Sequence, residues 1–137
     1  MTPDPAALLA GLAAMALAGA TAAQEVKPGL YQVTVEIEIP HIDTRDYTQT
    51  RDVCVSAGGK GLGPMGPGPL PACPSQTRRN GAVIEVTTRC TGPNTGWADA
   101  LYRPRPGGFK GSVAMNMGGK NMTLIERQTG IWIGPCK

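Results

Sequence analysis

Few side chains in this chain could carry out catalysis. His41 is the only histidine among 137 residues, so a catalytic serine or cysteine would need it as its base. No Gly-x-Ser-x-Gly nucleophile motif is present. His41 follows Pro40 at the end of a predicted strand, where a histidine is normally solvated. We therefore expect no catalytic residue and a protein that is not an enzyme.

Three carboxylates follow that strand: Asp43, Asp46 and Asp52. Two carboxylates can act as acid and base across a bond, or hold a hard cation. A small hydrolase that uses residues 43–52 is therefore one alternative function. Arg45 and Arg51 are interleaved with these acids, which is more typical of a salt-bridged surface.

The methionines suggest a second alternative, copper handling. Met115 and Met117 alternate along one predicted strand, and Met122 lies across the next turn. These thioethers and His41 would suit Cu(I) in an exported protein. Phe109 shares the face of Met115 and Met117, and methionine often fills irregular cores. The pattern favours a core, and we expect neither a metal nor another cofactor.

The first 23 residues are typical of an export signal. Residues 6–23 carry no charge, and Ala20-Thr21-Ala22-Ala23 resembles a cleavage site before Gln24. No Lys or Arg precedes the apolar stretch, which departs from the usual pattern. A retained membrane anchor is the alternative, since 18 uncharged residues approach the length of a membrane span. Only such an anchor would attach the protein to a membrane.

The four cysteines predict two disulfides. They lie 19, 17 and 46 residues apart and form no Cys-x-x-Cys motif, which disfavours a redox motif or a zinc site. An even count behind an export signal indicates disulfides, with three connectivities open. A hairpin turn at Asn80-Gly81 would place Cys73 opposite Thr88, and Cys90 within reach if the ladder has a small bulge. We expect Cys73–Cys90 and, with the remaining pair, Cys54–Cys136.

Alternating apolar and polar residues predict strands. In residues 30–39, Tyr31, Val33, Val35 and Ile37 share one face, which is typical of a half-buried strand. The other predicted strands are residues 47–55, 82–90, 109–117 and 122–128, the last continuing at 131–133 beyond a break at Gly130, with shorter ones at 75–78 and 98–103. We expect a single all-β domain over residues 24–137, an antiparallel meander of about seven strands that forms a sandwich or an open barrel.

Residues 58–71 differ from the rest in composition. Six glycines and four prolines fill these 14 positions. Such a stretch cannot be a strand, because proline lacks the backbone donor and glycine has no side chain to pack. We expect a flexible surface loop. The alternative is a polyproline-type docking segment with Met65 and Leu70 as its anchors.

The positive charge of the chain is modest. After residue 23 there are 13 basic and 9 acidic residues, a net charge of +4. A nucleic-acid surface needs dense positive charge and stacking aromatic residues, so we expect no nucleic-acid partner. Solubility among anionic envelope polymers is the simpler account. The basic residues that bracket the middle strands are Arg78, Arg79, Arg89, Arg103, Arg105 and Lys110.

The chain resembles the domain-of-unknown-function family 3617. Residues 27–35, Lys-Pro-Gly-Leu-Tyr-Gln-Val-Thr-Val, are similar to its opening Pro-Gly-Leu-Trp-x-Val-Thr strand, and residues 48–55 to its Thr-x-x-x-Cys strand. Residues 130–136 complete the order of four cysteines, so the resemblance covers nearly all of residues 24–137. Tyr31 stands where the family usually has tryptophan, and residues 58–71 are unusually rich in Gly and Pro.

Members of this family are small exported bacterial proteins, so the resemblance implies a periplasmic location and the four-cysteine pattern. It implies no catalytic or binding residue. With the export signal and the predicted disulfides, it leads us to expect a non-catalytic periplasmic β-domain. Such a domain would bind an envelope partner, either a protein or a small apolar molecule.

Overall fold

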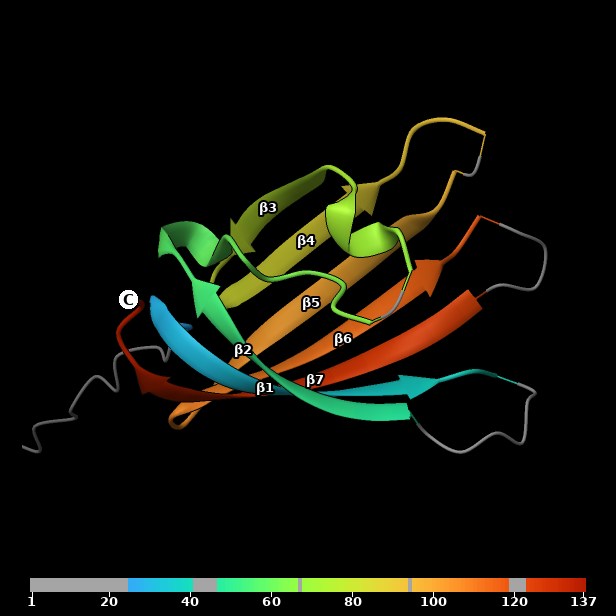
Figure 1. Cartoon of the computed structure of the whole chain (residues 1–137). Helices are drawn as coiled ribbons and strands as arrows, with labels where there is room; N and C mark the ends of the chain where they lie inside the picture. The colour runs from blue at the N-terminus through green and yellow to red at the C-terminus, as the bar shows by residue number, and fades with distance from the viewer. Residues whose placement is uncertain (1–24, 41–46, 67, 94, 119–122) are drawn as a thin grey trace, which may run out of the picture.

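The computed structural model describes residues 25–40, 47–66, 68–93, 95–118 and 123–137. Seven strands in this part of the chain form one antiparallel sheet (Figure 1). Two single-turn 3-10 helices, η1 (Ala57–Gly59) and η2 (Leu70–Ala72), lie between the second and third strands. The strands are β1 (Gly29–Glu38), β2 (Tyr47–Val55), β3 (Ser75–Asn80), β4 (Val83–Arg89), β5 (Trp97–Arg105), β6 (Gly108–Asn116) and β7 (Thr123–Gly134).

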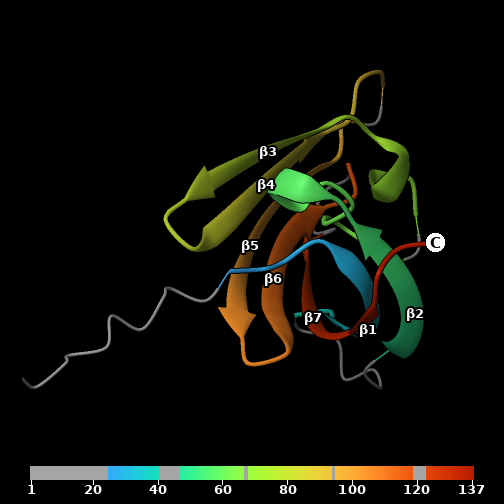
Figure 2. The ribbon, with the colours of Figure 1, turned by 90° about the vertical axis from the view of Figure 1, so that its left-hand side faces the viewer.

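The strand order is β2-β1-β7-β6-β5-β4-β3, and the sheet is strongly curved (Figure 2). The predicted all-β antiparallel fold is confirmed, as a single open sheet rather than a sandwich. The prediction of a simple meander is wrong at one point. Strands β3 to β7 pair in sequence, but β7 then returns to pair with β1. Strands β2 and β3 are therefore the two edges of the sheet, although they follow each other in the chain.

Alternation identifies the strands because one face of the sheet is buried. In β1, Tyr31, Val33 and Val35 are at most 1% exposed, and their neighbours in the strand point outward. Strand β7 runs unbroken through Gly130, where the sequence predicts a break. A Cβ atom at Gly130 would lie 2.3 Å from the ring of Phe109. The glycine therefore makes room for that ring without interrupting the strand.

The β3–β4 hairpin turns one residue later than predicted. Asn80 pairs with Val83, so the turn is Gly81-Ala82, and Gly81 has the positive φ of 62°. The register places Ser75 opposite Thr88, and the two hydroxyls hydrogen-bond at 2.7 Å. Continued by two residues, this register brings Cys73 opposite Cys90 without a bulge.

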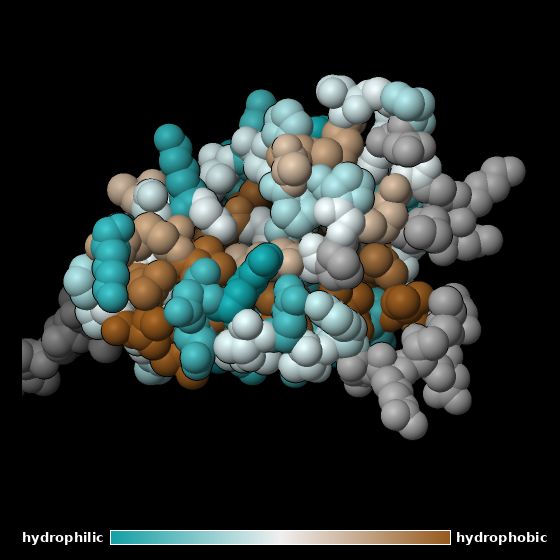
Figure 3. All heavy atoms as spheres, viewed as in Figure 1, coloured by the Kyte–Doolittle hydropathy of each residue, from teal (hydrophilic) through white to brown (hydrophobic). Residues whose placement is uncertain are grey.

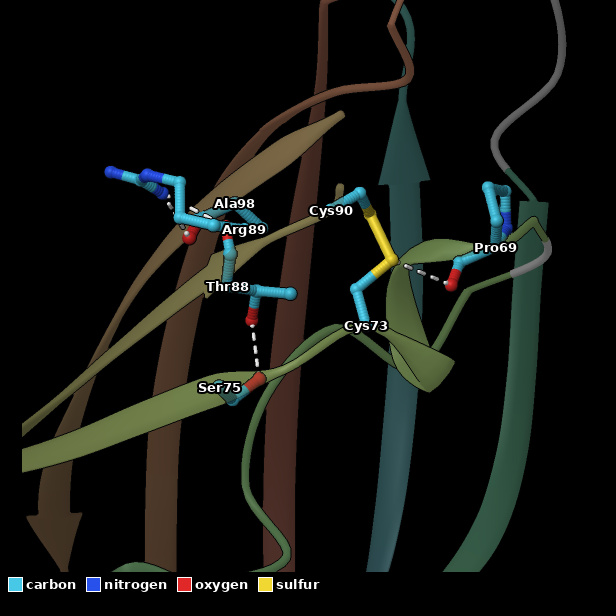
Figure 4. Close-up of a disulfide and its surroundings, with 7 residues drawn as sticks. All are labelled: Pro69, Cys73, Ser75, Thr88, Arg89, Cys90 and Ala98. Atoms are coloured by element: carbon cyan, nitrogen blue, oxygen red, sulfur yellow. Dashed lines mark hydrogen bonds between the residues drawn. A yellow bond between two sulfur atoms is a disulfide. The ribbon is translucent and has the colours of Figure 1, made fainter. Parts of the chain in front are cut away.

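Both predicted disulfides are confirmed. Cys73 bonds to Cys90, with Cα atoms 5.0 Å apart (Figure 4), and Cys54 bonds to Cys136, with Cα atoms 5.6 Å apart. The first bond closes the open end of the β3–β4 hairpin. The second ties the end of β2 to the C-terminus. Disulfides of this kind persist in oxidising compartments.

One segment between β2 and β3 packs against the sheet. It comprises residues 56–66 and 68–74 and is here called the inner segment. The sequence predicts a flexible surface loop within it, but the inner segment crosses the concave face of the sheet (Figures 1 and 2). Leu62, Met65 and Leu70 are at most 5% exposed and belong to the hydrophobic core. The docking anchors predicted as an alternative, Met65 and Leu70, therefore pack against the chain's own sheet.

Glycine composition explains how the inner segment fits so close to the sheet. A Cβ atom at Gly59 would lie 2.9 Å from Ile84, and one at Gly66 would lie 2.6 Å from Ile37. An open sheet leaves its apolar face in need of cover, and these glycines bring a backbone into contact with it. In a space-filling view, side chains fill the region where the ribbon leaves a gap (Figure 3).

Within the described ranges, no helix has the length and apolar character needed to cross a membrane.

Candidate functional site

Three polar side chains lie on the concave face beneath the inner segment. Tyr102 on β5 and Glu126 and Gln128 on β7 are at most 1% exposed. On β7, Glu126 and Gln128 lie directly opposite inward-facing residues of β6, since Val113 pairs with Glu126 and Gly111 pairs with Gln128. A buried polar side chain is stable only when its hydrogen-bonding groups are satisfied.

The Glu126 carboxylate binds the backbone of the inner segment. Its Oε1 accepts hydrogen bonds from the Met65 N–H at 2.8 Å and from Gln128 Nε2 at 2.6 Å, and its Oε2 accepts one from the Gly66 N–H at 3.1 Å. Both carboxylate oxygens are therefore engaged by donors of the chain itself. Hydrogen bonds to an ionised acceptor are among the stronger ones in proteins.

Gln128 and Tyr102 together bind Gly63. Gln128 Nε2 donates to the Gly63 carbonyl at 2.7 Å, and the Gly63 N–H donates to the Tyr102 hydroxyl at 2.9 Å. The hydroxyl also lies 2.9 Å from Gln128 Oε1. Since the Gly63 carbonyl already accepts from Gln128, donation by the hydroxyl to Gln128 Oε1 satisfies every group. Burial raises the pKa of Tyr102, so the hydroxyl keeps its proton.

Edge strand β2 contributes two further side chains. Arg51 Nη1 donates to the Met65 carbonyl at 2.8 Å, and Gln49 Nε2 donates to the same oxygen at 3.1 Å. Five side chains from three strands thus bind the backbone of three residues, Gly63, Met65 and Gly66. Among the described residues, no buried side-chain polar atom lacks a hydrogen-bond partner. The cluster is built to hold the inner segment on the sheet.

Burial raises the pKa of Glu126. Hydrogen bonds from Gln128 and from the Met65 and Gly66 amides, and the charge of Arg51, lower this pKa but do not offset the loss of hydration. The neutral form of the Glu126 carboxyl is therefore more favoured in the folded protein than it is for a glutamate exposed to water. Among the described residues, the other titratable groups that act on this carboxyl are Tyr102 on β5 and Arg51 on β2.

Replacing Glu126 with glutamine should flatten the pH dependence of stability. The pKa of Glu126 is higher in the folded protein than in the unfolded chain, where it is about 4.3. Its contribution is thus present below that pH and is lost as the pH rises through the folded-state pKa. We expect the free energy of unfolding of the wild type to fall more steeply with pH than that of Glu126→Gln. Urea unfolding at a series of pH values measures both slopes, and identical slopes would contradict this assignment.

The outer, convex face carries a groove of about 430 Å³ across β4, β5 and β6. Leu101 is 43% exposed beside it, and its strand neighbours across the sheet are Glu85 and Ser112. Small side chains around Leu101 leave the groove open. Its other lining residues are Val86, Thr87, Asp99, Ala100 and Ala114.

Two ion pairs lie at the rim of this groove. Arg78 pairs with Glu85 at 2.7 Å, and Arg89 pairs with Asp99 at 3.0 Å. Arg89 also donates to the carbonyls of Thr88 and Ala98 (Figure 4). Both acids of the groove lining therefore already have a cationic partner. Surface pairs of this kind contribute little to stability.

Of the metal and hydrolase candidates, the structure describes Met115, Met117 and Asp52. Met115 is 2% exposed in the core and Met117 is half-buried against it, as the core interpretation predicts. Asp52 is exposed on β2. The described residues contain no group of three His, Cys, Asp or Glu side chains that could hold a metal ion. The other candidates, His41, Asp43, Asp46 and Met122, and the predicted signal at 1–23 lie outside the described residues.

Sequence reasoning missed Glu126, Gln128 and the role of Tyr102. The signal was within reach, because the predicted turn at residues 118–121 already sets the register between the two strands that flank it. That register places Val113 opposite Glu126, and Val113 alternates in the sequence with Met115 and Met117, so it shares the face that is predicted to be core. Polar residues at inward positions of β7 would then have marked a buried polar cluster.

Comparison with known proteins gives one match. The model of a family described as "Protein of unknown function (DUF3617)" matches residues 26–136. Neither a curated protein nor a solved structure matches the chain significantly.

Proposed function

The chain belongs to the DUF3617 family, and we propose that this member is an exported, non-catalytic β-domain. It binds a protein partner in the periplasm through its convex face. The observation that supports this choice most is the position of the inner segment. It occupies the apolar concave face, where a small apolar ligand would otherwise bind, and leaves the groove beside Leu101 open on the other face.

The disulfides support export. Cys54–Cys136 and Cys73–Cys90 lie at the two ends of the inner segment, so the two bonds restrain both of its ends. Bonds of this kind form and persist outside the cytosol. The predicted signal at residues 1–23 would deliver the chain to such a compartment.

The chemistry of Glu126 supports a non-catalytic role. A general acid or base must reach a proton of its substrate. Both oxygens of Glu126 are engaged by amides of the inner segment and by Gln128, and the side chain is fully buried. This carboxyl binds the inner segment to the sheet, and neither of its oxygens is accessible to a substrate.

Photo-crosslinking in living cells tests the proposed function. A photoreactive amino acid is placed at Leu101, beside the groove, and in a control chain at Gln32, which is exposed on β1. We expect a discrete crosslinked product of higher mass from position 101 and none from position 32. Monomer alone at position 101, with a small apolar molecule retained in native mass spectrometry, would contradict the proposal and favour the small-molecule alternative.

A further inference from the structure

Two like charges face each other across the convex face. Arg103 on β5 pairs directly with Lys110 on β6, and both side chains are exposed. Like charges at directly opposite positions of an antiparallel pair destabilise a sheet. Arg105, two residues farther along β5, adds a third cation at the same end.

No acid compensates this pair within the described part of the chain. The next strands place Thr129 beside Lys110 and, by continuation of the β4–β5 register, Val83 beside Arg103. Neither Arg103 nor Lys110 takes part in an ion pair among the described residues. The nearby acids Glu85 and Asp99 are held by other arginines. This cross-strand pair is thus an unfavourable charge arrangement with no counterion among the residues that the structure describes.

The charges of the convex face are also segregated by strand. On β3 to β6, the cations Arg78, Arg89, Arg103 and Lys110 outnumber the acids Glu85 and Asp99. On β1 and β2 the outward charges are acidic: Glu36, Glu38 and Asp52. An anionic partner would therefore be attracted to the half of the face that carries the groove.

The apolar groove adjoins this basic end. Leu101 precedes Arg103 by two residues on the same face of β5, and Ser112 follows Lys110 by two on β6. A partner that places an apolar side chain beside Leu101 would have its neighbouring residues next to Arg103 and Lys110. The hydroxyls of Ser112 and Thr87 line the groove, where they are placed to hydrogen-bond a peptide backbone.

We infer that the groove beside Leu101 and the cations Arg103, Lys110 and Arg105 bind an acidic peptide segment of a partner protein. An apolar side chain of the segment enters the groove, and its carboxylates neutralise the facing cations. A peptide fits better than an anionic membrane, because a single apolar side chain can enter the groove and a bilayer surface cannot. This inference rests on the proposed function, for which it names the chemistry of the partner.

Titration of the purified, disulfide-bonded protein with two synthetic peptides tests the inference. The acidic probe is acetyl-Asp-Glu-Leu-Glu-Asp-amide, and the control probe replaces each acid with lysine. We expect amide chemical-shift changes on β4, β5 and β6 for the acidic peptide alone, with a dissociation constant below about 1 mM at low salt. Binding should weaken as salt is raised, because exposed charges are screened.

Charge-reversal variants distinguish peptide binding at this site from nonspecific attraction to the positive charge of the protein. Arg103→Glu combined with Lys110→Glu should weaken binding at least about tenfold, whereas Lys60→Glu, at an exposed residue of the inner segment, should change it less than about twofold. Lys110→Glu alone should raise the midpoint of thermal unfolding, since it turns a repulsive cross-strand pair into an attractive one. This gain is a readout independent of the peptide and shows that the variant still folds.

Three outcomes would overturn the inference. They are no shift with the acidic peptide at 1 mM, equal binding of the lysine peptide, and binding of phosphatidylglycerol vesicles in place of the peptide. If position 101 crosslinks to a protein but the acidic peptide does not bind, the proposed function stands and the acidic chemistry fails. If neither occurs, both fail.

Discussion

Replacing Leu70 with alanine is expected to lower the free energy of unfolding by about 2–5 kcal/mol. Leu70 lies in η2 within the inner segment and is 1% exposed. Its truncation leaves a cavity in the hydrophobic core to which Leu70 belongs. Urea unfolding, monitored by the fluorescence of Trp97 and Trp132, measures the loss.

An exposed residue of similar size provides the control for this change. Ile131 on β7 is 57% exposed, and Ile131→Ala should cost less than about 1 kcal/mol. A surface loop at residues 58–71 would make the two substitutions equivalent. A loss at Leu70 no larger than that at Ile131 would therefore contradict the packing of the inner segment.

Removal of both disulfides should have the second large effect. By the chain-entropy estimate, Cys73–Cys90, with a sequence separation of 17, contributes about 3 kcal/mol, and Cys54–Cys136, with a separation of 82, contributes about 4–5 kcal/mol. Domains of this size are typically stable by about 5–15 kcal/mol. The reduced protein should therefore be close to unfolded at 37 °C, as circular dichroism with and without reductant would show.

Serine pairs separate the contributions of the two bonds. Cys54→Ser with Cys136→Ser should destabilise more than Cys73→Ser with Cys90→Ser, because the longer loop gains more entropy on release. A melting temperature unchanged by reductant, with all four thiols shown to be free, would refute the role assigned to the disulfides.

Local patterns account for the parts of the fold that the sequence predicts. Strand β1 has apolar residues at every second position, so its inward face follows from period two alone. Strand β2 has the predicted bounds, Tyr47–Val55. The Cys73–Cys90 pair follows from the nearby hairpin turn, even though the turn is Gly81-Ala82 and not Asn80-Gly81. These features depend on residues close in the chain.

The position of the inner segment depends on residues that are distant in the chain. A prediction from the composition of residues 58–71 alone therefore gives a surface loop, which is wrong. Glycine and proline exclude a strand but do not decide between an exposed loop and a packed one. The contacts that decide it come from far along the chain: Gly63 binds Gln128, 65 residues away, and Met65 binds Glu126, 61 residues away. Two clues were present, the apolar residues Leu62, Met65 and Leu70 and a cysteine near each end.

The candidate binding face could be predicted in part. Arg103 and Lys110 were counted among the basic residues, and they are equidistant from the Pro106-Gly107 turn of the β5–β6 hairpin. Recognition of that turn would have placed them opposite each other, as the register does. The groove beside Leu101 could not be predicted in this way, because it depends on small side chains from three strands meeting on one face.

Native-state hydrogen exchange at the amides of Gly63, Met65 and Gly66 tests most directly whether the inner segment is packed on the concave face of the sheet. These amides donate to Tyr102 and Glu126 beneath the inner segment. We expect protection within about 1 kcal/mol of the global free energy of unfolding, while the exposed Gly58 exchanges freely. Exchange of Gly63, Met65 and Gly66 at the rate of an unstructured peptide would contradict this packing, since the concave face would then be open to a ligand.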